Sequence, residues 1–132
     1  MGIKNPEQFK EWQKRVEEDY GSAKMLLDND GFPSVVCFHA HQVVEKYLKG
    51  YLAYNDFELE KTYQLDGLLK EIAKIDEEFM QFVDEAVSLN DYYIEARYPT
   101  DFREDIPLEE AKEALKKAAN VRDFVLSKVE IY

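Results

Sequence analysis

The sequence predicts an all-α fold, an up-and-down bundle of four to five helices that forms a single domain over residues 1–132. Residues 33–55 are apolar on nearly every side when wound as a helix, and such a helix must be surrounded by other elements. Further segments carry apolar residues three and four positions apart, which is the spacing of one helix face. No segment shows the alternation of a strand, and no internal repeat is present.

The boundaries of the first two helices follow from local capping signals. Asn5 suits the N-cap of the first helix and Pro6 suits its first position. Gly31 fits the stop of that helix, and Pro33 fits the start of the central one, which runs to Tyr54 or Asn55.

In the second half of the chain, the sequence predicts three further helices, which are shorter or more polar than the central one. Asp76 can cap a fourth helix, which we expect to include Tyr93 and Ile94 on its apolar face. Residues 96–107 form a loop because Pro99 and Pro107 interrupt the chain, and Leu108 then begins the apolar face of the last helix. The expected helices cover residues 6–28, 33–54 or 33–55, 65–75, 77–94 and 108–129.

Composition narrows the classes of partner. The chain has 17 Lys and Arg against 28 Asp and Glu, a net charge of −11. This balance argues against broad binding to nucleic acid or to an anionic membrane, so RNA is a partner that the net charge does not support. The single Cys37 lies in the most apolar stretch and is expected to be a core residue. No run reaches the length of a membrane span, and we expect a cytoplasmic protein that does not engage a membrane.

The histidines do not form a metal motif. Di-iron bundles use Glu-x-x-His pairs, and neither His39 nor His41 has a Glu three positions earlier. His41 and Glu45 are one helical turn apart, and a hydrogen-bonded pair is the expected arrangement, with no metal.

One polar stripe interrupts the central helix, made of His39, Gln42, Lys46 and Lys49 with Glu45 beside it. Two interpretations of this stripe stay open. With the Arg and Tyr residues after the fourth helix, the stripe could hold a phosphate or a nucleotide base. Alternatively Glu45 pairs with Lys49, Gln42 bonds across a dimer seam and Arg97 caps the fourth helix. The candidate ligand-binding residues are His39, Gln42, Glu45, Lys46, Lys49, Tyr92, Arg97 and Tyr98.

Several blocks of the sequence resemble the HEPN domain family. CFHAHQVVEKYLKGYL, residues 37–52, resembles the family signature Cys-Phe-x-x-Gln-Gln-x-x-Glu-Lys-x-x-Lys. KTYQLDGLLKEI, YYIEARYPTD and EEAKEALKKA resemble the later blocks in the same order and spacing. The resemblance implies a helical homodimer whose gene often lies beside that of a small nucleotidyltransferase, as a toxin–antitoxin pair. It also implies that some members are metal-independent ribonucleases that use an Arg-x(4–6)-His motif.

The sequence departs from that ribonuclease pattern. Both histidines precede every arginine except Arg15, and Tyr63 stands where the second block usually has His. Without a well-placed imidazole, the chain lacks the group that would act as general acid or base in the cleavage of RNA near neutral pH. We therefore expect a nucleotide-binding or regulatory partner of a nucleotidyltransferase, with ATP or GTP as the ligand. The alternatives are a ribonuclease that uses Arg97 with His39 or His41, and a non-catalytic dimeric interaction module.

Overall fold

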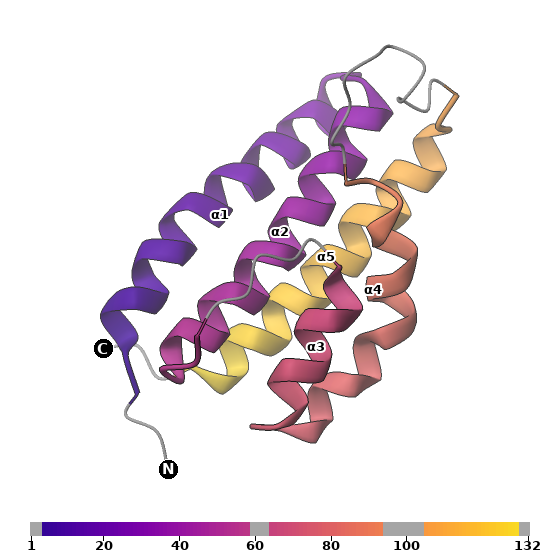
Figure 1. The fold of residues 1–132 in the computed structure, drawn as a ribbon. Coiled ribbons are helices and arrows are strands. Elements are labelled where there is room, and N and C mark those ends of the chain that lie inside the picture. Colours follow the sequence, from indigo (N-terminus) through magenta and orange to yellow (C-terminus); the bar gives the residue numbers. More distant parts are fainter. Residues whose placement is uncertain (1–3, 59–63, 94–104, 130–132) are drawn as a thin grey trace.

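The computed structural model describes residues 4–58, 64–93 and 105–129, and these residues form a bundle of helices around α2 (Figure 1). α1 and α2 run antiparallel, side by side, and no strand occurs in the described residues. The predicted all-α bundle is confirmed. The elements are α1 (Pro6–Asp28), α2 (Pro33–Tyr54), α3 (Leu65–Ala73), the 3₁₀ helix η1 (Glu77–Phe82), α4 (Val83–Asn90) and α5 (Leu108–Lys128).

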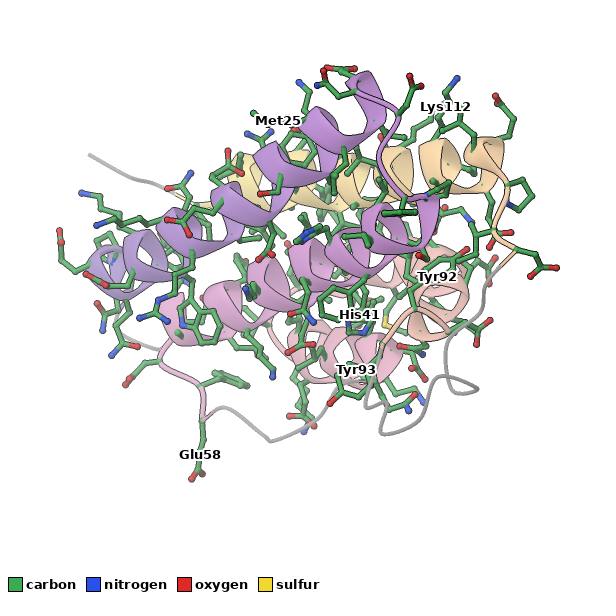
Figure 2. The ribbon with its side chains drawn as sticks, turned by 90° about the horizontal axis from the view of Figure 1, so that it is seen from above. Met25, His41, Glu58, Tyr92, Tyr93 and Lys112 are labelled. Atoms are coloured by element: carbon green, nitrogen blue, oxygen red, sulfur yellow. The ribbon has the colours of Figure 1, made fainter. Side chains whose placement is uncertain are left out.

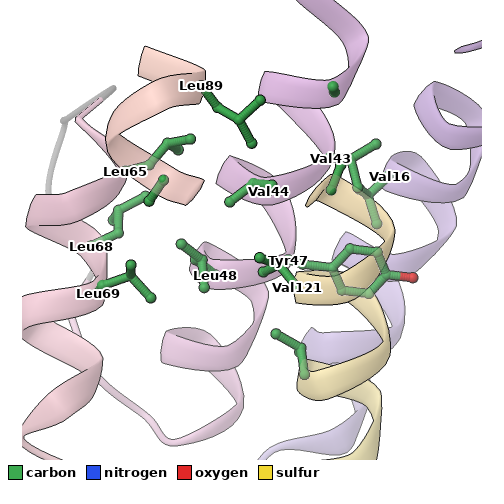
Figure 3. Packing of buried hydrophobic residues seen from close by; sticks show 14 of the residues in the cluster. Val16, Val43, Val44, Tyr47, Leu48, Leu65, Leu68, Leu69, Leu89 and Val121 are labelled. Atoms are coloured by element: carbon green, nitrogen blue, oxygen red, sulfur yellow. The ribbon is translucent and has the colours of Figure 1, made fainter. Parts of the chain in front are cut away.

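α2 is the centre of the core, as its sequence predicts. Fourteen of its 22 residues are buried, so side chains on several of its faces contact different helices. Figure 3 shows Val43 beside Val16 of α1 and Leu48 facing the leucines of α3. Burial of an aliphatic side chain contributes roughly 1.5–3 kcal/mol to the free energy of folding. In this protein, α2 lies at the centre of that burial.

The local signals at the ends of α1 act as expected. The Asn5 side chain accepts a hydrogen bond from the Gln8 N–H at 3.2 Å, and Pro6 occupies the first turn. The Gly31 N–H donates to the Leu26 carbonyl at 2.6 Å, which closes the end of the helix. A Cβ at Gly31 would lie 2.5 Å from Leu26 Cδ2, so only glycine allows this close approach.

The fourth helix differs from the prediction in its first turns and at its end. Residues 77–82 form a 3₁₀ helix, in which side chains three apart lie on one side. Phe79 and Phe82 use this alignment to contact the Phe124 ring, with centroids 4.9 and 5.1 Å away. α4 then ends at Asn90, whose side chain accepts from the Leu65 N–H at 2.8 Å and donates to Asp66 at 2.9 Å.

The structure differs from the sequence prediction in further details. Tyr93 was expected on the helix and instead follows its end, and Ile94 lies outside the described residues. Leu108 was expected to face the core, but it is 42% exposed because it begins α5 at the margin of the bundle.

Two glycines test the packing of α1 against α2. A Cβ at Gly50 would lie 3.0 Å from Trp12 Cβ, whereas no atom lies within 4 Å of the same position at Gly21. We expect Gly50→Val to destabilise the fold by about 1–3 kcal/mol, because the added methyl groups overpack the contact. Gly21→Ala should stabilise it by roughly 0.5–1 kcal/mol, because alanine loses less backbone entropy in a helix. Chemical denaturation measures both, and equal effects at the two sites would contradict this packing.

Candidate functional site

The polar stripe lies along α2, on a side that contacts α1. The structure places His39, Gln42, Glu45, Lys46 and Lys49 on α2, and Tyr92 just after α4. The other two predicted ligand residues, Arg97 and Tyr98, lie outside the described residues. Tyr93 immediately precedes their segment in the chain, so the described part of the site ends beside α2 (Figure 2).

Asp19 of α1 contacts His39 and Lys46 of the stripe, and we call such a carboxylate, which contacts two side chains, a node. Its Oδ1 lies 3.0 Å from His39 Nδ1, and its Oδ2 accepts a hydrogen bond from Lys46 Nζ at 2.6 Å. The three side chains are only 15–28% exposed, so the ion pair is screened less than one at the surface. Lys46 therefore already has a counter-ion, and the sequence prediction missed it because Asp19 lies on another helix.

Glu45 forms the second node of the stripe. Lys49 Nζ donates to Glu45 Oε2 at 2.9 Å, which is the (i, i+4) pair expected from sequence. Glu45 Oε1 lies 3.7 Å from Nδ1 of the fully buried His41, which is too long for the hydrogen bond that was predicted. The His41 ring also lies against Tyr93, with centroids 5.5 Å apart.

A third node, which the sequence analysis did not identify, connects three helices. Arg122 of α5 donates to Glu17 of α1 through Nε at 2.9 Å and through Nη2 at 2.6 Å. The hydroxyl of Tyr47 on α2 donates to the same carboxylate at 2.8 Å. Arg122 also lies over the Tyr20 ring, 4.8 Å from its centroid. This bidentate pair fixes α5 against α1 at a defined point along both helices.

Tyr92 is engaged within the protein. Its hydroxyl donates to Glu110 of α5, and its half-buried ring packs against the core. Burial, and then the hydrogen bond to Glu110, raise the pKa of the Tyr92 hydroxyl, so this group is a neutral donor at physiological pH. The described residues contain no group of three or more His, Cys, Asp or Glu that could hold a metal ion.

Comparison with known proteins decides the family. The family model described as HEPN domain matches residues 9–129. This chain belongs to the HEPN family. It is 31% identical over 126 residues to "Putative toxin MJ1304" of Methanocaldococcus jannaschii, and the match covers 85% of this chain and 82% of that relative.

A solved structure supports the same fold. The crystal structure of ST0689, an archaeal HEPN homologue, superposes with a TM-score of 0.73 at 22% identity, covering 92% of this chain and 98% of the other. Along the described residues, no helix is both long and apolar enough to cross a membrane.

Acid should weaken the Glu17 node. The bidentate hydrogen bond from Arg122 holds the pKa of Glu17 below its usual 4.5, against the opposing effect of burial. A carboxyl group whose pKa is lower in the folded than in the unfolded protein stabilises the fold at pH values above its pKa in the unfolded protein. This stabilisation is lost as the pH falls through the pKa of the group in the folded protein. We therefore expect the thermal midpoint to decrease as the pH is lowered below 4.5. Glu17→Gln should make this decrease less steep. Glu18→Gln, at the exposed neighbouring position, is the control and should leave the pH profile unchanged.

Proposed function

We propose that this HEPN protein is the toxin-side member of a pair with a small nucleotidyltransferase, and that the polar stripe of α2 binds a nucleotide. The observation that carries this proposal is the pair of lysines kept on an otherwise buried helix. Lys46 and Lys49 are 28% and 13% exposed, and each is held by a carboxylate. Similarity to a protein named as a toxin supports the assignment of the toxin side. The homodimer implied by the family resemblance is part of the same proposal.

Ligand binding at this stripe is an exchange of ionic partners. Asp19 and Glu45 hold the two amino groups in place before a ligand arrives, so the positions of the cations are already set. A phosphate must share these amino groups with the carboxylates, because an uncompensated carboxylate in a half-buried place is costly. Such binding is moderate in strength and falls with rising salt, because part of the ionic attraction already exists in the free protein.

We expect two residues that follow α4 in the sequence to complete this proposed site. Arg97 would supply a forked ligand for a phosphate, and Tyr98 would supply a ring for a base. His39 has its Nδ1 fixed by Asp19, so its other ring nitrogen is the one available to a ligand. Gln42 lies between the two nodes and offers both a donor and an acceptor.

The proposed nucleotide site can be tested by thermal denaturation. Saturating ATP or GTP should raise the thermal midpoint of the wild-type chain, because a ligand that binds only the folded state stabilises it. Lys49→Ala should remove most of this increase, since the phosphate loses one of its two described cations. Lys14→Ala, at an exposed position of α1, removes the same charge away from the stripe and should keep the increase. An unchanged midpoint with every nucleotide would contradict the proposal.

If the gene beside that of this chain encodes a small nucleotidyltransferase, as the proposal requires, the pair can be tested by co-expression of the two proteins. We expect the two proteins to purify as a stable complex, and the intact mass of this chain to show whether a nucleotide-sized group is attached to a tyrosine. A lone homodimer of unmodified mass would contradict the pairing. Cleavage of RNA by the purified chain without added metal, abolished by Arg97→Ala, would favour the ribonuclease alternative instead.

A further inference from the structure

A groove separates α1 from α5 on the side of the bundle away from the α2 stripe. Both helices pack on α2, and the Glu17–Arg122 pair joins them near the middle. Beyond that pair, towards the C-terminal end of α1, they leave an open groove of about 250 Å³. Its floor is apolar and consists of Leu27, Leu115 and Ala119. Figure 2 shows this edge of the molecule from above, where Met25 and Lys112 mark the two helices.

The rim of the groove is basic in a chain whose net charge is −11. Lys24 projects from α1, and Lys112 and Lys116 project from α5, against the single carboxylate of Asp28. Lys112 shares its charge with Glu109 at 3.4 Å, but Glu109 is 84% exposed and such surface pairs contribute little. An apolar floor between two basic edges is complementary to a helix that carries apolar side chains flanked by carboxylates.

The chain itself presents a helix of this kind. Asp84, Val87 and Asp91 are exposed and lie three and four positions apart, so they share one face of α4. Val87 is 50% exposed, and Met80, about two turns earlier in η1, is 37% exposed. The opposite side of α4 is buried in the core and does not take part in this surface. We name the exposed set of Met80, Asp84, Val87 and Asp91 the acidic face.

We propose that the groove between α1 and α5 binds the acidic face of a second copy of this chain. Val87 would contact the apolar floor, and the two aspartates would lie beside the lysines of the rim. One molecule cannot satisfy both surfaces, because α1 and α4 lie on opposite sides of α2 (Figure 1).

The contact is therefore heterologous, with the groove of one copy holding the face of the next. Two grooves facing each other would place lysines against lysines, so this surface is not suited to symmetric pairing. The assembly extends by adding copies until it closes into a ring or continues as a chain.

The association should be weak and sensitive to salt. A single helix in a groove two turns long buries much less than the roughly 1,600 Å² of a standard stable interface. Its specificity comes from the opposed charges, whose attraction between exposed groups is screened over about 8 Å at physiological ionic strength. Assembly is accordingly expected at high protein concentration and low salt.

The test is sedimentation of the full chain with one variant on each surface. The wild-type chain should form species larger than the homodimer as its concentration rises, and added salt should reverse this. Lys116→Glu should abolish these species because it reverses a charge on the rim of the groove. Val87→Asp should abolish them because it removes the apolar residue of the acidic face. A mixture of the two variants should form species larger than either variant forms alone, with equal amounts of both, because one keeps an intact face and the other keeps an intact groove.

The controls separate this contact from other modes of association. Lys14→Glu makes the same change of charge on α1 away from the groove and should associate as the wild type does. A mass that stays constant with concentration and salt would overturn the proposal. It would also be overturned by larger species that persist in both variants, or by a mixture that forms no complex. None of these readings depends on nucleotide binding or on the nucleotidyltransferase.

Discussion

Burial of α2 on nearly all sides is the constraint from which the rest of this structure follows. A helix so enclosed leaves no room for unpaired charge, yet its sequence includes Glu45, Lys46 and Lys49. Each of these groups therefore has a partner nearby, either one turn along α2 or on the adjacent face of α1. Removing one member of such a pair costs more than the pair itself contributes, because the remaining charge loses its compensation. The apolar core supplies most of the free energy of folding. The ion pairs restrict how the helices can be arranged, because an arrangement that separates the paired charges is unfavourable.

The nodes also define how far each helix can slide against its neighbours. Asp19 binds two residues of α2 that are seven positions apart, so a shift of α1 along its axis would lengthen at least one of the two contacts. Glu17 binds α2 and α5 at once, and so connects α1 directly to both of them. A network of this kind selects one register among several that would bury similar apolar area.

The parts of the structure that sequence predicted are those set by neighbours in the chain. The ends of α1 and the Glu45–Lys49 pair depend on residues within five positions of one another, and both were predicted. The contacts of η1 are made with Phe124, more than forty positions later, and neither these contacts nor the 3₁₀ geometry was predicted. The same reason explains why Asp19 and Arg122 were missed as members of the polar network. Periodicity identifies which residues face inward, but it does not say which polar group of another helix they meet.

The two functional surfaces proposed for this chain differ in the state of their cations. On α2 the lysines are already held by carboxylates, so a ligand must match their fixed positions and compete for their charge. In the groove the lysines rise from exposed helix faces around an apolar floor, which favours an extended acidic surface over a compact anion. α1 contributes to both, because Asp19 and Tyr20 are successive residues that face the stripe and the groove respectively. A contact that displaced α1 in the groove would therefore also alter the distance between Asp19 and Lys46.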